Sequence, residues 1–261
     1  MNVLETILPH VVPFFATLAR MSGIFIFAPL LSSAMIPTQV KVILSIAMAF
    51  AVYPTIDHAT WMTTLSGLDI VGLIPLIFGE ALIGFTVGLL ATIPVLSIQM
   101  GGLLMGQQMG LGIASIFNPA LESDGDVVGQ ILLYLAIAMF LSLGGIEYMH
   151  LAVVNTFANV PPGGFAMHRA PLELLVGLIT SGSELALRVA APVLCIVFLE
   201  TLATGFLMKT VPQLNILSFG FPVKILVGLL MLIAAIGMIG EALHVELAET
   251  LDIILIWAEN L

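Results

Sequence analysis

Residues 69–100 read DIVGLIPLIFGEALIGFTVGLLATIPVLSIQM, an apolar run of more than 30 residues with one interior charge, Glu80. A helix crosses a bilayer with about 20 apolar residues. At about 1.5 Å per residue, this run is about 45 Å long as a helix. A lone strand cannot satisfy its backbone hydrogen bonds in lipid. The run therefore predicts a helix that is longer than the hydrocarbon core of a membrane.

The rest of the chain has the same character. Of its 261 residues, 60% are apolar and 8% are charged. The mean hydropathy is +1.20, which is typical of an integral membrane protein. The formal net charge of −10 leaves no basic face for nucleic acid. No base precedes Arg20, so we expect no cleavable signal peptide and a chain that is retained whole.

Breaks at Pro, Gly and charge clusters divide the chain into six long apolar segments. Their approximate bounds are 9–31, 38–54, 69–100, 127–157, 171–208 and 222–257. The predicted fold class is all-α, a polytopic helical membrane protein with about six long apolar helices. Tilt, or kinks at Pro75, Pro94 and Pro192, accounts for part of the excess length. The remainder indicates helices that continue beyond the bilayer under other protein, as in a large assembly.

Ionisable residues in these segments are costly at membrane depth unless they are paired or hydrated. Glu184 and Arg188 are four residues apart on one helix, and we interpret them as a structural ion pair rather than transport residues. Arg20 and Glu80 are candidates for the same kind of pair between helices. Glu200 has no basic residue three or four positions away, so it is a proton-relay candidate, although a partner in a neighbouring subunit is favoured.

No catalytic or metal-binding pattern occurs in the sequence. The five histidines are scattered, without HExxH, Ser/His/Asp or phosphate-loop spacing. Cys195 is the one cysteine, which excludes a disulfide within the chain and a Cys/His metal spacing. We therefore expect neither an enzyme nor a bound cofactor or metal.

The few basic residues predict an orientation. Lys41, Lys209 and Lys224 flank connections on one side of a six-span arrangement, and Arg169 lies in a connection on the other. The positive-inside rule then places the three lysines in the cytoplasm and both termini on the opposite side.

Four runs carry a resemblance to a known family. They are LARMSGIFIFAPLLSSAMIPTQVKVILSIAMAFAVYP (18–54), GEALIGFTVGLL (79–90), GGLLMGQQMGLGIASIFNPA (101–120) and TVPQLNILSFGFPVKILVGLLML (210–232). In order and spacing they are similar to the FliR/SctT family of type III secretion export-gate proteins, over nearly the whole chain. The most specific part is VPQLN followed by GFPVK.

The resemblance implies a subunit of a gate through which unfolded flagellar proteins cross the bacterial inner membrane at the flagellar basal body. It implies a FliP-like helical part at 1–170, with a central constriction loop at about 101–126, and a FliQ-like helical hairpin at 171–261. The implied partners are FliP-like and FliQ-like subunits, an FlhB-like switch protein, export substrates in transit and membrane lipid. The resemblance further implies that these subunits form a hetero-oligomeric cone that rises out of the bilayer. An equivalent subunit of a virulence type III secretion system is the alternative.

The run 101–120 has two interpretations, which can share residues. Gly102, Gly106 and Gly110 recur every four residues and form a smooth groove for close helix packing. With Gly112, they also give the backbone freedom to bend. In the family context we expect a pore constriction instead, sealed by flexible apolar side chains. Its residues are then Met105, Gln107, Gln108, Met109, Ile113, Ile116 and Phe117.

The connection at 212–222 is more apolar than a solvent loop. It either packs on its own helices or, as the resemblance implies, docks the FlhB-like switch protein. The residues concerned are Pro212, Gln213, Asn215, Phe219, Gly220 and Pro222.

Two further classes of function are open at this point. A proton-coupled secondary transporter would build a solute site from Glu80, Glu147 or Glu200 at broken helices. A purely structural scaffold would tolerate any substitution in 101–120 that preserves packing.

Overall fold

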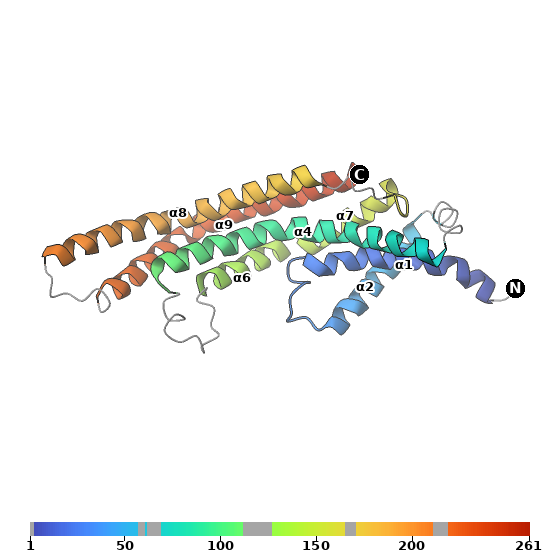
Figure 1. Ribbon diagram of the computed structural model, residues 1–261, viewed down its shortest axis with the longest axis horizontal. Coiled ribbons are helices and arrows are strands. Elements are labelled where there is room, and N and C mark those ends of the chain that lie inside the picture. The colour runs from blue at the N-terminus through green and yellow to red at the C-terminus, as the bar shows by residue number, and fades with distance from the viewer. Residues whose placement is uncertain (1–2, 57–60, 62–68, 112–126, 165–170, 211–218) are drawn as a thin grey trace. The chain divides into compact units, whose positions relative to one another are not determined.

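The computed structural model describes residues 3–56, 61, 69–111, 127–164, 171–210 and 219–261 (Figure 1). Its regular elements are α1 (Val3–Phe27), α2 (Thr38–Val52), the short 3₁₀ helix η1 (Tyr53–Thr55), α4 (Ile70–Met109), α6 (Val127–Ser142), α7 (Gly145–Asn159), α8 (Leu172–Thr210) and α9 (Phe221–Glu259). No strand occurs in the described ranges. The predicted all-α fold class is confirmed.

The helices have the length and composition of membrane spans. Among the described residues, α1, α2 with η1, α4, α8 and α9 pass this test singly, and α6 and α7 pass it as a bent pair. The helices α4, α8 and α9 hold 40, 39 and 39 residues. Each is therefore about 60 Å long, against about 30 Å for the hydrocarbon core. The prediction of helices longer than a bilayer is confirmed.

The fourth apolar segment is bent by 60° between α6 and α7 rather than continuous. Gly144 stands at the bend with φ +74°, a conformation that side chains disfavour. Its N–H donates to the Leu141 carbonyl at 3.1 Å, and its own carbonyl accepts from the N–H of Tyr148 at 3.0 Å. Gly145 packs directly on the ring of Phe140, where a Cβ has no room. The sequence pattern does not predict this break, because two glycines in an apolar run are compatible with a continuous membrane helix.

The chain divides into two compact units, and each is described by itself. The first comprises 1–92, 140–176 and 248–261, and the second comprises 93–139 and 177–247. Because the divisions fall inside α4, α6, α8 and α9, each of these helices contributes residues to both units. This grouping by contact does not test the expected boundary at residue 170 between FliP-like and FliQ-like parts, which stays a prediction.

In the first unit, α1 and α4 approach until their backbones touch. A Cβ at Gly84 would collide with the backbone oxygen of Arg20, and a Cβ at Gly23 would collide with that of Ala81. One turn further along both helices, a Cβ at Gly88 would lie 2.8 Å from the carbonyl oxygen of Ile24. Glycine permits this approach, which is a common packing mode of membrane helices.

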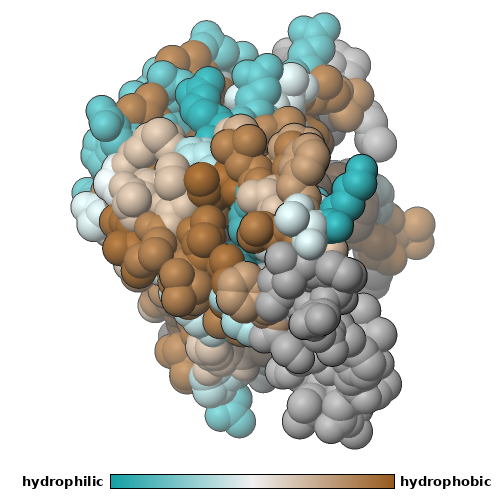
Figure 2. Space-filling model, turned by 90° about the vertical axis from the view of Figure 1, so that its left-hand side faces the viewer, coloured by the Kyte–Doolittle hydropathy of each residue, from teal (hydrophilic) through white to brown (hydrophobic). Residues whose placement is uncertain are grey.

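In the second unit, one stripe of α8 is buried and the stripe stops before the helix does. The buried residues of α8 are Leu178, Gly182, Leu185, Ala186, Val189, Ala190, Val193 and Val197. Their spacing of three and four residues places them on one helix face. Beyond Val197 the side chains of Phe198 and Phe206 are 63% and 74% exposed. Figure 2 shows the side of the molecule on which α8 ends, and apolar side chains gather on its surface. This part of α8 therefore leaves apolar surface uncovered.

We expect Gly84→Ala to destabilise the purified protein, because the new Cβ has to push α1 away from α4. Overpacking of this kind costs about 1–3 kcal/mol. The control is Gly79→Ala in the same helix, since a Cβ at Gly79 meets nothing within 4 Å. That change should be neutral or slightly stabilising through helix propensity. The measurement is the apparent melting temperature in mild detergent, and equal values for the two variants would contradict the close approach of the helices.

Candidate functional site

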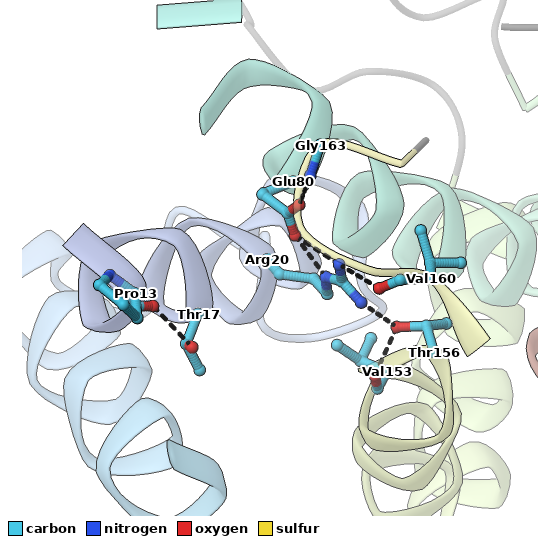
Figure 3. Close-up of polar contacts among 8 residues, drawn as sticks. All are labelled: Pro13, Thr17, Arg20, Glu80, Val153, Thr156, Val160 and Gly163. Atoms are coloured by element: carbon cyan, nitrogen blue, oxygen red, sulfur yellow. Dashed lines mark hydrogen bonds and ion pairs between the residues drawn. The ribbon is translucent and has the colours of Figure 1, made fainter. Parts of the chain in front are cut away.

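A buried ion pair joins α1 to α4 in the first unit (Figure 3). Arg20 and Glu80 have side chains that are 0% exposed, and Nη2 of Arg20 lies 2.6 Å from Oε2 of Glu80. The Nε–H donates to the same oxygen at 2.6 Å. Charge-assisted bonds of this length are strong, and they offset part of the cost of removing both charges from water. The candidate pairing of these two residues is confirmed.

The remaining hydrogen bonds of the pair reach α7 and the turn that follows it. The Arg20 guanidinium donates from Nη1 to Oγ1 of Thr156 at 3.1 Å, and from Nη2 to the carbonyl of Val160 at 3.2 Å. The second carboxylate oxygen of Glu80 accepts the N–H of Gly163 at 2.9 Å. Gly163 has φ +72°. Two charges therefore hold α1, α4, α7 and a glycine turn in one arrangement, as Figure 3 shows.

Aromatic rings pack close to the guanidinium. Its central carbon lies 4.2 Å from the ring centroid of Phe157 and 5.7 Å from that of Trp61. Both rings attract the cation and keep water away from it. Since the guanidinium is bonded through three nitrogens and the carboxylate through both oxygens, neither group is free to hold a solute. This arrangement favours a structural role for the pair over a transport role.

The predicted ion pair between Glu184 and Arg188 is not formed within the described part of the chain. Both side chains are exposed on α8. Holding two long, exposed side chains in one geometry costs about as much rotamer entropy as the screened attraction returns. Their spacing on the helix permits contact but does not enforce it.

Glu200 follows the buried stripe of α8 by three residues. Its Oε1 is buried and has no hydrogen-bond partner in the structure described. An unpaired carboxylate oxygen is costly when water cannot reach it. A donor from outside the chain would remove this cost, so the expectation of a partner in a neighbouring subunit stays a prediction.

The structure corrects the start of the predicted constriction loop at 101–126. Residues 101–109 continue α4 as a helix. The helix ends at Met109. Gly110 follows it with φ +83° and donates its N–H to the carbonyl of Gln107 at 3.0 Å. The N–H of Leu111 donates to the carbonyl of Gly106 at 3.1 Å. These two bonds form a Schellman cap, which requires a residue that tolerates the left-handed conformation.

The glycines of this stretch are helical because neighbouring helices of the second unit pack on them. A Cβ at Gly101 would lie 2.9 Å from the carbonyl oxygen of Ala186 in α8. A Cβ at Gly102 would lie 2.5 Å from the Cα of Gly129 in α6. Close packing therefore compensates the low helix propensity of glycine here.

The predicted constriction residues divide into three groups. Met105 and Met109 are 0% exposed, and Met109 packs on Gly228 of α9, where a Cβ would lie 2.6 Å from the methionine Cγ. Gln107 and Gln108 are exposed. Gly112, Ile113, Ile116 and Phe117 lie outside the described residues. The glutamines are therefore the described candidates that face away from the packed interior, and a pore role for any of these residues stays a prediction.

The predicted docking connection is described only at its end. Pro212, Gln213 and Asn215 lie outside the described residues. Phe219 is 48% exposed, Gly220 is buried and Pro222 is exposed. The exposure of these three residues is compatible both with docking of a partner and with packing of the connection on its own helices.

Sequence reasoning missed several contacts of the ion-pair network. Gly84 and Gly88 show the same four-residue spacing as Gly102 and Gly106, so the run GEALIGFTVGLL already indicates a glycine face for close helix packing. Nothing local marks Thr156, whose role comes from contacts far away in the sequence. Among the described residues, no three His, Cys, Asp or Glu side chains gather as metal ligands.

The sequence matches the family described as bacterial export proteins, family 1, over residues 11–250. The chain belongs to this family. It is 29% identical to the flagellar biosynthetic protein FliR of Bacillus subtilis (strain 168), over 87% of this chain and 86% of the relative. It is 28% identical to the flagellar biosynthetic protein FliR of Escherichia coli (strain K12), over 87% and 85%, and 25% identical to the Yop proteins translocation protein T of Yersinia pestis, over 83% and 82%. The predicted membership of the FliR/SctT family is confirmed.

We expect Glu80→Ala to destabilise the protein by about 3–5 kcal/mol, because it leaves the charge of Arg20 buried and unpaired. The double variant Arg20→Met with Glu80→Leu should recover a large part of this loss, since apolar residues often replace a buried pair at little cost. Glu184→Ala, at an exposed position, is the control and should change little. Unfolding of the purified variants gives the free energies. If the double variant loses as much free energy of unfolding as the two single replacements together, the two charges are not coupled.

Proposed function

We propose that the chain is a subunit of the flagellar type III protein export gate. It helps to form and seal the pore through which unfolded flagellar proteins cross the inner membrane at the basal body. The observation that carries this proposal is the family match over residues 11–250, together with flagellar relatives aligned over most of their length. The subunit of a virulence type III secretion system is the second candidate, because the Yersinia relative aligns over a similar share of the chain.

Surfaces that the chain leaves uncovered support its place in an assembly. The helix α2 buries only three of its residues, Ser45, Ala49 and Val52. The end of α8 is apolar and exposed, and Glu200 has a buried oxygen without a partner among the described residues. FliP-like and FliQ-like subunits would cover such surfaces, and an FlhB-like switch protein would dock at the connection between α8 and α9. We further propose that the FliP-like part is 1–170 and the FliQ-like hairpin is 171–261.

We assign the seal of the pore to the end of α4 and the residues that follow it. A narrow apolar ring blocks ions because water is unstable inside it. Methionine is flexible enough to repack when a substrate passes. Met109 packs on Gly228, and Gly110 is the helix cap where the backbone direction changes. A small rotation about this point would expose or withdraw the methionines.

We expect deletion of the gene to abolish swimming, and a plasmid copy to restore it. A tagged copy should bring FliP-like and FliQ-like subunits with it in mild detergent, because an uncovered apolar helix surface is stable only against lipid or other protein. A deletion strain that still swims would contradict the flagellar assignment. Loss of effector secretion in such a strain would favour the virulence branch.

We expect the double variant Met105→Ala with Met109→Ala to make cells leak small ions while the gate still assembles. Removing both side chains widens the seal and leaves a cavity behind it. The control is Met100→Ala in the same helix, whose side chain is 56% exposed. Ion leakage is measured with a membrane-potential dye. An intact barrier in the double variant would leave these methionines as packing residues only.

A further inference from the structure

A cavity of about 580 Å³ lies in the first unit between α2 and the bend that joins α6 to α7. Its α2 wall includes Leu44, Ala47 and Ala51, and its opposite wall includes Gly144, Glu147 and His150. The other residues that line it are apolar, and none of them is Lys or Arg.

The shape of this cavity suits a helix. Ala47 and Ala51 are exposed and lie one turn apart on α2, and Gly144 on the opposite wall has no side chain. Small residues on both walls allow another backbone to approach closely, which is how membrane helices associate. The helix α2 is itself apolar, with Val42 and Ile43 54% and 67% exposed.

The polar groups of the cavity exclude a purely hydrocarbon occupant. His150 has a buried Nδ1 with no hydrogen-bond partner among the described residues. Lipid tails have no hydrogen-bonding groups, so a lipid there would leave this nitrogen unpaired at membrane depth. Glu147 adds a carboxylate to the same wall. This wall has a carboxylate and an imidazole but no Lys or Arg, so it is complementary to a Lys or Arg side chain that donates hydrogen bonds.

The helical period of α7 separates this wall from the ion-pair network. The buried face of α7 consists of Gly145, Met149, Ala152, Val153 and Thr156. At about 100° per residue, Glu147 points to the opposite side of the helix from the centre of that face, and His150 lies on the flank, about 115° from it. The buried face of α7 therefore holds the fold of the subunit, and the rest of its surface presents Glu147, which is exposed, and the His150 Nδ1, which has no partner among the described residues.

We propose that this cavity is the docking groove for a transmembrane helix of a neighbouring subunit. That helix presents a face of small residues to Ala47 and Ala51 and a Lys or Arg side chain to Glu147 and His150. The proposal rests on the proposed function in one respect, that the chain works as one subunit of a membrane assembly. It adds the surface, the kind of partner and the residues that recognise it.

The first test fills the groove. Ala51→Phe occupies the cavity, whereas Val42→Phe adds the same side chain at an exposed position of α2 that does not line it. We expect Ala51→Phe to lower the recovery of partner subunits in mild detergent by about tenfold, the effect of losing one good contact. The melting temperature of the isolated chain should not change for either variant. Equal partner recovery with the two variants would overturn the proposal.

The second test separates partner contact from internal packing. His150→Phe removes the unpaired nitrogen and keeps a ring of similar size, so the isolated chain should be as stable as the wild type or more stable. Recovery of the partner should fall, because the donor on the incoming helix loses its acceptor. A less stable chain with undiminished partner recovery would make His150 a packing residue and overturn its assigned role.

The third test identifies the occupant. Ala51→Cys in a Cys195→Ala background is crosslinked in native membranes, and the product is mapped by mass spectrometry. We expect a crosslink to a membrane helix that carries a Lys or Arg and belongs to another subunit. Capture of a photoreactive phospholipid alone would overturn the proposal. If the wild-type chain recovers no export subunit, the proposed function fails. The groove proposal is tested separately, by whether the cysteine at position 51 crosslinks to such a helix.

Discussion

The fold of the first unit depends on the buried contact between Arg20 and Glu80. The same α1 residue sets both the distance and the register of α4, because its side chain bonds to Glu80 while its backbone oxygen meets Gly84 one turn later. A bulkier residue at Gly84 would separate the helices and weaken the ion pair. Loss of either charge would leave the other buried without compensation. Thr156 and Gly163 extend this constraint to α7 and its following turn.

The second unit is packed by small residues instead. The backbones of α8 and α6 pack directly on Gly101 and Gly102, and the side chain of Met109 packs on Gly228. Surfaces beyond this packed region remain uncovered by the described chain. Two polar atoms are buried without partners in that chain, one in Glu200 of the second unit and one in His150 of the first. A protein with these properties is incomplete alone at membrane depth. We propose that other subunits of the export apparatus supply the remaining contacts.

The sequence predicts the helices well, because apolar length in a membrane protein leaves the backbone few alternatives. It also identifies Arg20 and Glu80 as candidates for a pair, since a charge in an apolar segment is costly at membrane depth unless it is paired or hydrated. It does not predict the bend at Gly144, and it leaves open whether residues 101–109 are a packed helix or part of a loop, because both depend on what packs against a glycine. The contacts of Thr156 and Val160 with Arg20 join residues more than 100 positions apart. No local pattern encodes such a contact.

We propose that the end of α4 lies on the route of exported protein. The most direct measurement is a crosslink between Gln107→Cys, in a Cys195→Ala background, and an export substrate stalled in the assembled gate. Gln107 is exposed beside the helix cap, and Tyr134→Cys on α6, at a side chain that is 53% exposed, is the control. We expect a substrate crosslink from position 107 and none from position 134. An assembled gate with a stalled substrate and no crosslink from position 107 would contradict the claim.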